Sequence, residues 1–388
     1  MAAARVRSRW TDLHPDLLGL VLSRVLSHAD RVRLRAVCRA WRSGARTVQH
    51  LLPPLPPLAA LRDGSFLSLP DGAIHRMPIP EDVFHRVCTG GMLFLVHHDD
   101  RCSLMHPGSG DVTPQEIRPT TIWYRLTVPT RTSAEEVRKV VVADHFVAVR
   151  TLKSVRVYAR GGAESTGVEW VAPEYCSPES ADMALFQGKL YVLTVKKEDR
   201  EYGLYALDIA GSAEEGGISV VASVPCISGT KIPRDRTSSF YRQHRFYLVV
   251  SGDRLLMVEH TINRWPDGAR APSEFLVLEA ADLNGQAPGW SKVDTLMGHA
   301  LFVSEGCSES LSLPVGVTVS GGAHEDCIYF MSEAYANGYN YSYYMELECG
   351  VYNMRQGTVE SPLPPFNMMA ETTLEGPWPP TWLFPVGT

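Results

Sequence analysis

The residues best suited to chemistry are two histidines followed by two aspartates, His97-His98-Asp99-Asp100. Imidazole nitrogens and carboxylate oxygens are common ligands of zinc and other divalent metals. Successive side chains of a strand point to opposite faces of a sheet, so four consecutive residues converge poorly on one ion. We therefore interpret this run as a polar turn between two strands, and we expect no metal site.

Two further clusters lack the spacing of a catalytic site. Ser304-Glu305-Gly306-Cys307-Ser308 does not contain the Gly-x-Ser-x-Gly pattern that holds a nucleophilic serine on a tight turn. His324-Glu325-Asp326 is typical of a solvated turn before a strand, and the glycine pairs of the chain indicate turns rather than a phosphate-binding loop. The sequence therefore predicts no enzymatic activity and no cofactor.

A tyrosine-rich stretch near residue 340 allows two interpretations. Tyrosine, asparagine and glycine are typical of adaptable recognition loops, and a client-binding surface here would include Tyr335, Tyr339, Tyr341 and Tyr343. The alternative is a hairpin that turns at Asn337-Gly338, with the last three tyrosines on one face of its second strand. Periodicity alone favours the hairpin.

The N-terminal region predicts two or three short helices between residues 10 and 46. Apolar residues recur there at the spacing of one helix face: Leu17, Leu18, Val21, Leu22, Val25 and Leu26. Pro15 can begin the first helix without losing a hydrogen bond, and Asp30 can cap the second. A unit of roughly 40 residues is too small to bury so much apolar surface alone. Either the rest of the chain or another protein must cover it.

Two motifs in this region resemble the F-box. Leu13-His14-Pro15-Asp16-Leu17-Leu18 is similar to its first motif, with His14 where the family usually has a proline, and Val37-Cys38-Arg39-Ala40-Trp41 is similar to its second. The resemblance implies binding to the Skp-type adaptor and, through it, to the cullin and RING protein of an SCF-type ubiquitin ligase. The implied adaptor-binding face contains Leu13, Pro15, Leu17, Leu18, Val21, Leu22, Val25, Leu26, Leu34, Val37, Cys38 and Trp41. Apolar periodicity alone favours the alternative, a helical hairpin packed on the main domain.

Charge is distributed unevenly along the chain. Residues 1 to 50 contain ten arginines and three aspartates, whereas the whole chain has a net charge of −6. A basic head can indicate nucleic-acid binding, but no aromatic stacking motif accompanies these arginines, and we expect no nucleic-acid partner. We interpret them as a solvated face that steers the head toward an acidic partner, as the Skp-type adaptors are.

The sequence contains no signal for membrane insertion or secretion. Its longest apolar runs are shorter than a membrane span, and the first residues lack the apolar segment of a secretory signal. We therefore expect a cytoplasmic and/or nuclear protein without a membrane partner.

A proline-rich segment divides the chain into two parts. Prolines 53, 54, 56 and 57 indicate a stiff, extended linker. We expect a helical F-box domain at residues 8–48, the linker at residues 49–61 and a β domain at residues 62–388.

The β domain contains a weak repeat of a turn followed by an apolar strand. The markers Leu93, Val147, Leu190, Phe246 and Leu301 are separated by 54, 43, 56 and 55 residues, and further units lie at residues 66–77 and 327–354. Such periods are typical of four-stranded sheets arranged radially. We expect a mainly β protein in which a small α-helical F-box precedes a β-propeller of about six blades.

The C-terminal third of this domain is similar to the plant KIB-type F-box propellers. The similarity lies in Trp290-Ser291-Lys292-Val293, Leu301-Phe302-Val303, Cys327-Ile328-Tyr329-Phe330, Gly350-Val351-Tyr352 and the segment from Trp378 to Pro385. It implies the substrate receptor of an SCF-type ligase, with the propeller binding a client protein of unknown identity. Two alternatives stay open: a docking or blocking protein that works outside a ligase, and a propeller enzyme with an unrelated helical head.

Overall fold

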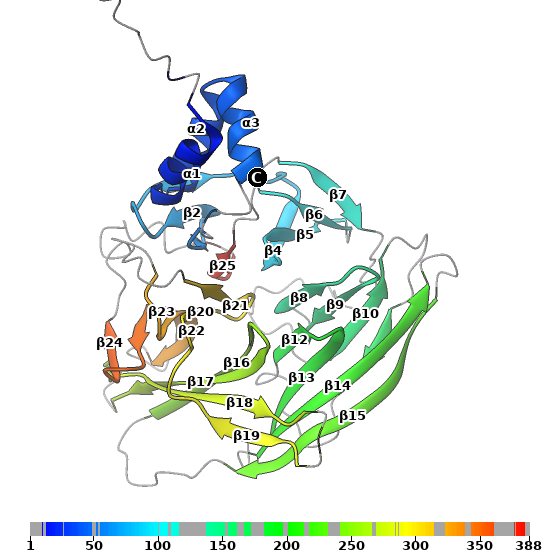
Figure 1. The fold of residues 1–388 in the computed structure, drawn as a ribbon. Helices are drawn as coiled ribbons and strands as arrows, with labels where there is room; N and C mark the ends of the chain where they lie inside the picture. The colour runs from blue at the N-terminus through cyan, green and yellow to red at the C-terminus, as the bar shows by residue number, and fades with distance from the viewer. Residues whose placement is uncertain are drawn as a thin grey trace, which may run out of the picture.

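Six β-sheets surround a central axis, and three short helices lie beside the first of them (Figure 1). This computed structural model describes residues 10, 13–25, 27–48, 52, 55–99, 101–107, 110–115, 137–151, 154–160, 167–171, 182–196, 201–212, 217–231, 241–265, 269–283, 285, 287–313, 323–337, 343–360, 376 and 378–384. The mainly β architecture with six blades confirms the fold predicted for the body of the chain.

The helical head consists of α1 (Pro15–Arg24), α2 (His28–Ala36) and α3 (Arg39–Val48). Pro15 begins α1 as predicted, and the Nδ1 atom of His14 accepts a hydrogen bond from the backbone N–H of Asp16 at 3.4 Å. Ser27, rather than Asp30, caps α2, because its hydroxyl oxygen accepts a hydrogen bond from the N–H of Asp30. None of the described helices is long and apolar enough to cross a membrane.

The six sheets are numbered here as blades in chain order. Blade 1 contains β1 (Leu58–Ala60), β2 (Ser65–Ser68), β3 (Ile74–Arg76) and β25 (Thr381–Leu383), and blade 2 contains β4 (Val83–Thr89), β5 (Met92–His97), β6 (Cys102–Met105) and β7 (Val112–Gln115). Blade 3 contains β8 (Lys139–Val142), β9 (Phe146–Arg150), β10 (Val155–Ala159) and β11 (Val168–Trp170), and blade 4 contains β12 (Asp182–Phe186), β13 (Lys189–Lys196), β14 (Glu201–Ser212) and β15 (Gly217–Lys231). Blade 5 contains β16 (Tyr241–Ser251), β17 (Arg254–Arg264), β18 (Glu274–Ala281) and β19 (Gly289–Lys292), and blade 6 contains β20 (His299–Val303), β21 (Ser308–Ser312), β22 (Cys327–Asn337), β23 (Tyr343–Asn353) and β24 (Thr358–Glu360).

Blade 1 closes the ring by pairing the two ends of the body. Its strand order is β25-β1-β2-β3, and Leu58 lies opposite Leu383 in the antiparallel register of β1 and β25. The predicted linker at residues 49–61 is therefore wrong at its C-terminal end, since residues 58–60 form a strand of the propeller. The proline pattern concealed this strand, although Pro57 is buried directly before it.

The repeat markers identified blades better than they identified strands. Leu93, Val147 and Leu190 lie in the second strand of their blades, whereas Phe246 lies in the first strand of blade 5. Leu301 and the unit at 327–354 were expected as separate units, but both belong to blade 6, where β20 pairs in parallel with β22. First and second strands of different blades have the same turn-and-apolar signature, so the pattern alone does not give a strand's position within its blade.

The core lies between neighbouring blades. One cluster joins blades 1, 2 and 6 and includes Leu93, Phe302 and Trp382. Trp382 is fully buried, its ring meets that of Phe302 edge-on at 5.2 Å, and its Nε1 donates a hydrogen bond to the carbonyl oxygen of Val303 at 3.1 Å. This packing holds the closing strand β25 against blade 6.

Candidate functional site

The head has an internal core that includes part of the predicted adaptor-binding face. Leu18 and Leu22 are 2% and 0% exposed and pack with Ala45 and Val48 of α3. The prediction that these two leucines contact a partner is wrong, because the fold of the head already buries them. Leu13, Leu34 and Trp41 lie partly buried around the same core.

The opposite side of α1 is exposed. Leu17 and Val21 are 51% and 42% exposed, and Leu20 is 58% exposed. Neighbouring residues lie about 100° apart around a helix, so the predicted stripe is wide enough for one half to face the core and the other half to face solvent. Val25 is half-buried between the two halves, and Leu26 lies outside the described residues.

The second motif contributes both structure and exposed surface. Val37 is 61% exposed and Val32 is 43% exposed. The Sγ atom of Cys38 accepts a hydrogen bond from the backbone N–H of Trp41 at 3.4 Å, which caps α3, and Trp41 Nε1 donates to the carbonyl oxygen of Trp10 at 2.7 Å. We call the exposed residues Leu17, Leu20, Val21, Val32 and Val37 the head face.

The start of the second helix lies close to blade 1 of the propeller. Ser27, directly before α2, lies near the carboxylate of Asp71, in the turn between β2 and β3. Burial tends to raise the pKa of Asp71, but the hydrogen bond from the N–H of Ala73 and the nearby hydroxyls of Ser68 and Ser27 outweigh it and lower the pKa.

The tyrosine-rich stretch belongs to a hairpin of blade 6. Strands β22 and β23 pair so that Asn337 lies opposite Tyr343 and Tyr335 lies opposite Met345. The hairpin is confirmed, but the predicted turn at Asn337-Gly338 is wrong, since the second strand begins only at Tyr343. Tyr339 and Tyr341 lie outside the described residues.

His98 and Asp99 lie in the expected polar turn after β5, which ends at His97, and Asp100 lies outside the described residues. His97 Nδ1 lies 2.8 Å from a carboxylate oxygen of Asp82, and its Nε2 lies 2.7 Å from the hydroxyl oxygen of Ser103. His98 is exposed and lies against the ring of Phe84. Within the described part of the chain, no group of three or more histidine, cysteine or acidic side chains is arranged to hold a metal ion.

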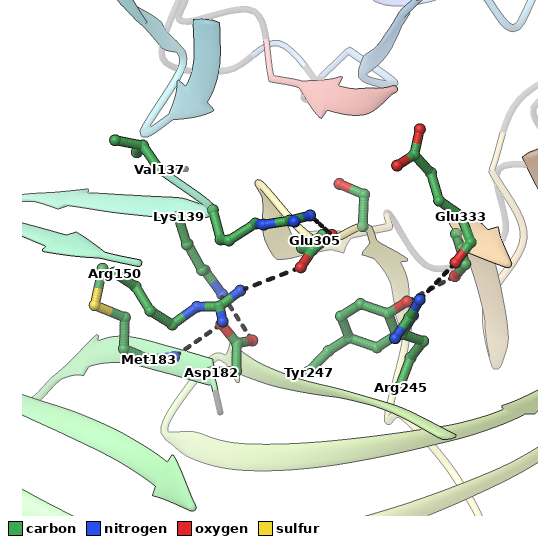
Figure 2. A network of polar contacts seen from close by, with 12 residues as sticks. Val137, Lys139, Arg150, Asp182, Met183, Arg245, Tyr247, Glu305 and Glu333 are labelled. Atoms are coloured by element: carbon green, nitrogen blue, oxygen red, sulfur yellow. Dashed lines mark hydrogen bonds and ion pairs between the residues drawn. The ribbon is translucent and has the colours of Figure 1, made fainter. Parts of the chain in front are cut away.

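The most concentrated polar chemistry lies at one end of the propeller's central channel, where the innermost strands of blades 3, 4 and 5 begin (Figure 2). Lys139 Nζ lies 2.9 Å from the carboxylate of Asp182, and both side chains are buried. Asp182 also accepts hydrogen bonds from the backbone N–H groups of Met183 at 2.8 Å and Leu248 at 2.7 Å. This carboxylate therefore has partners on three consecutive blades.

Glu305 enters the same network from the loop before β21. Its carboxylate accepts a hydrogen bond from Arg138 Nη1 at 3.0 Å and lies 3.8 Å from Arg150 Nη2. Burial tends to raise the pKa of Glu305, but the positive charges of Arg138, Arg245 and Arg150 outweigh it and lower the pKa. Glu305 is therefore held in its ionised form.

Arg245 and Tyr247 complete the network from β16. Arg245 Nη2 donates to the backbone carbonyl oxygen of Glu333 at 2.8 Å, and the carboxylate of Glu333 pairs with Arg62. The hydroxyl of Tyr247 lies 2.6 Å from that of Ser332, and burial raises the pKa of Tyr247. These contacts connect blade 5 with blades 1 and 6.

A cavity of about 350 Å³ adjoins this network within the channel. Its lining includes Cys88, Lys139, Met183, Cys307 and Glu309. Burial raises the pKa of Glu309, and it raises the pKa of the Cys88 thiol to about 12, so this thiol is not an activated nucleophile.

The sequence analysis did not identify this network as a site. Its charged residues are isolated single residues in different repeats, and the ring of blades brings them together. A charged residue at the start of an innermost strand, as in Lys139 and Asp182, is the sequence feature that could have indicated this site. The sequence pattern did not show which strands are innermost.

Comparison with known proteins identifies the fold and the family. No curated protein matches the chain. Among solved structures, the N-terminal domain of Nup159 is 12% identical, with 78% of this chain and 74% of that chain covered and a TM-score of 0.25. The Nup133 β-propeller domain of Vanderwaltozyma polyspora is 8% identical, with 77% and 83% covered and a TM-score of 0.28. Saccharomyces cerevisiae Sqt1 is 11% identical, with 77% and 87% covered and a TM-score of 0.27.

A family match is more specific than these structural similarities. The KIB1-4 beta-propeller family matches residues 66–353, from the first blade to the β23 strand of the last. The match covers most of the propeller and more than half of the chain, and the chain belongs to the KIB1-4 beta-propeller family.

Proposed function

We propose that this chain is a protein-interaction receptor, in which the head binds a Skp-type adaptor and the propeller binds a client protein. The observation that carries the proposal is the concentration of exposed apolar side chains on the head. Among the described residues, the strongly exposed large apolar side chains of the head are Trp10, Leu17, Leu20, Val21, Val32 and Val37. Exposed apolar surface concentrated in this way is typical of a protein-protein contact.

The charge and core of the head support the same function. The N-terminal arginines, with Arg33 and Arg39 exposed on α2 and α3, match an acidic adaptor and would speed its association. Leu18 and Leu22 give the three helices a core of their own, so the head face does not depend on the propeller for its shape. Through the adaptor, the chain would join the cullin and RING protein of an SCF-type ligase without itself transferring ubiquitin.

A binding experiment with a purified Skp-type adaptor tests this proposal. Leu17→Arg and Val37→Arg should each weaken binding about 30-fold, the effect of removing an interface hot spot. Val221→Arg is a matched control, because Val221 is 65% exposed on the β15 strand of the propeller. Unchanged adaptor binding by both head variants, with folding verified by circular dichroism, would contradict the proposal.

Co-purification from cells then distinguishes a ligase subunit from a docking protein. Adaptor, cullin and RING protein recovered together support the ligase. Adaptor recovered without cullin supports the alternative role as a docking or blocking protein outside a ligase.

A further inference from the structure

Among the described residues of the polar network in the central channel, positive charges outnumber negative charges. We call this group the channel mouth; its cations are Arg62, Arg138, Lys139, Arg150 and Arg245, and its carboxylates are Asp182, Glu305 and Glu333. Five cations and three carboxylates leave an excess of two positive charges. Figure 2 shows Arg150 and Arg245 on opposite sides of Glu305, with Arg150 directed toward Glu305 and Arg245 toward Glu333.

The ion pairs locate the excess charge. Lys139 pairs with Asp182, Arg138 with Glu305, and Arg62 with Glu333. Two arginines have no carboxylate oxygen at hydrogen-bonding distance among the described residues. Arg150 Nη2 lies 3.8 Å from Glu305, which is too far for a hydrogen bond, and Arg245 donates to the neutral backbone oxygen of Glu333.

Arg150 is the less satisfied of the two. Its side chain is 4% exposed, and its Nε and Nη1 atoms have no hydrogen-bond partner within the part of the chain that the structure describes. Leaving buried donors of a charged group unpaired is costly. Burial lowers the pKa of Arg150; the charges of Asp182 and Glu305 act in the opposite direction, and the charges of Arg138 and Arg245 add to the lowering. Two donor atoms of this guanidinium are therefore buried without an acceptor among the described residues.

Part of the channel mouth is exposed to solvent, and a cavity lies next to it. The side chains of Glu305 and Arg138 are 30% and 22% exposed, so the mouth opens to solvent. The cavity of about 350 Å³ adjoins it and is partly lined by Lys139 and Met183. The apolar part of that lining, which includes Val140 and Leu185, would accommodate the organic portion of a ligand.

We propose that Arg150 and Arg245 bind a doubly charged oxyanion of the phosphate class at the channel mouth. A phosphate dianion would neutralise both excess charges, whereas a carboxylate would neutralise one. The planar guanidinium also matches two phosphate oxygens at once. The anion would be either free phosphate or a small phosphomonoester, or a phosphorylated side chain of a client; the second source rests on the proposed receptor function.

The test measures binding of inorganic phosphate to the full chain at pH 7.5 and low ionic strength. Calorimetry should detect binding, and phosphate should raise the melting temperature more than sodium chloride does at equal ionic strength. Arg150→Gln and Arg245→Gln should each weaken binding at least about tenfold. Arg254→Gln is the control. Arg254, the first residue of β17, donates a hydrogen bond to Glu279 at 2.9 Å and lies at the other end of blade 5 from the channel mouth. This variant should bind phosphate as the wild type does.

Equal melting shifts with phosphate and chloride, or undiminished phosphate binding by Arg150→Gln and Arg245→Gln, would overturn the proposal. If Arg150→Gln does not fold, Arg245→Gln and the wild-type titration decide the question. A phosphoserine peptide compared with its unphosphorylated form distinguishes the sources, since binding of phosphate but not of the peptide indicates a small anion. Adaptor binding is measured separately, so failure of this site and failure of the receptor function remain distinguishable.

Discussion

Lys139 and Asp182 form a buried ion pair between the innermost strands of blades 3 and 4, with 2.9 Å between Nζ and the carboxylate. Their side chains are 6% and 3% exposed. Because Asp182 also accepts a hydrogen bond from the N–H of Leu248 on blade 5, the pair helps to set the relative position of three blades.

Removing one partner of this pair should be strongly destabilising. Lys139→Met leaves the carboxylate of Asp182 buried without its counter-ion, and we expect a loss of about 3 kcal/mol in the free energy of unfolding. Lys189→Met is the control, because Lys189 pairs with Asp208 at 3.2 Å near the surface. That change should cost less than about 1 kcal/mol. Similar losses in urea denaturation of the two variants would contradict the structural role of the buried pair.

Glu305 should stabilise the fold at neutral pH. Its pKa in the folded chain lies below the ordinary 4.5, so its contribution is present above that pH and is lost as the pH falls through the folded pKa. Glu305→Gln should therefore lower the free energy of unfolding by about 1 kcal/mol at pH 7. It should also flatten the dependence of that energy on pH below 4.5, as measured by urea denaturation across a pH series.

The pKa of Glu309, in the neighbouring strand β21, is shifted in the opposite direction to that of Glu305. Burial raises its pKa above 4.5, so stability falls as the pH rises from 4.5 through the folded pKa. Glu309→Gln should leave stability at pH 7 unchanged or higher and remove this decline. Equal destabilisation by Glu305→Gln and Glu309→Gln at pH 7 would contradict the opposite pKa shifts of the two carboxyl groups.

The closure of the propeller predicts where a stable truncation must begin. A chain starting at residue 55 keeps β1, which pairs with both β2 and β25, and should unfold cooperatively. A chain starting at residue 62 loses this central strand of blade 1 and should melt at a lower temperature or be insoluble. Equal melting temperatures by calorimetry would show that β1 contributes little to closure.

The two sides of α1 should respond differently to truncation. Leu22→Ala opens a space between α1 and α3, and we expect it to cost about 2 kcal/mol or more in the stability of the head. Leu20→Ala, at a residue 58% exposed, should change stability by less than about 0.5 kcal/mol. Thermal melting followed by far-ultraviolet circular dichroism measures the difference, and a head unaffected by Leu22→Ala would contradict the core described here.

The tyrosines of the β22–β23 hairpin provide a test of client recognition. Changing Tyr339 and Tyr341 together to Ser should reduce client capture in affinity enrichment at an unchanged melting temperature, because recognition loops gain contact area from tyrosine. Tyr241→Ser, at an exposed position of β16, is the control. A large fall in the melting temperature of the double variant would instead indicate that these side chains pack between strands.

Much of the fold follows from local sequence patterns. Pro15 marks the start of α1, and recurring apolar strands such as Leu93 and Val147 indicate a radial β architecture, because helix and strand periodicity depend on residues close in the chain. The F-box-like motifs likewise indicated the helical head, and the binding partner of the head stays a prediction.

The site at the channel mouth was decided only by the tertiary structure. Arg62, Lys139, Arg150, Arg245 and Glu305 are distant in sequence, and none belongs to a recognisable motif. They meet because six blades direct strand ends toward one axis, and closure depends on β1 pairing with β25 across most of the chain's length. The sequence also did not decide which half of the apolar stripe on α1 is buried. Leu22 is buried and Leu17 is exposed because α3 packs on only one side of α1.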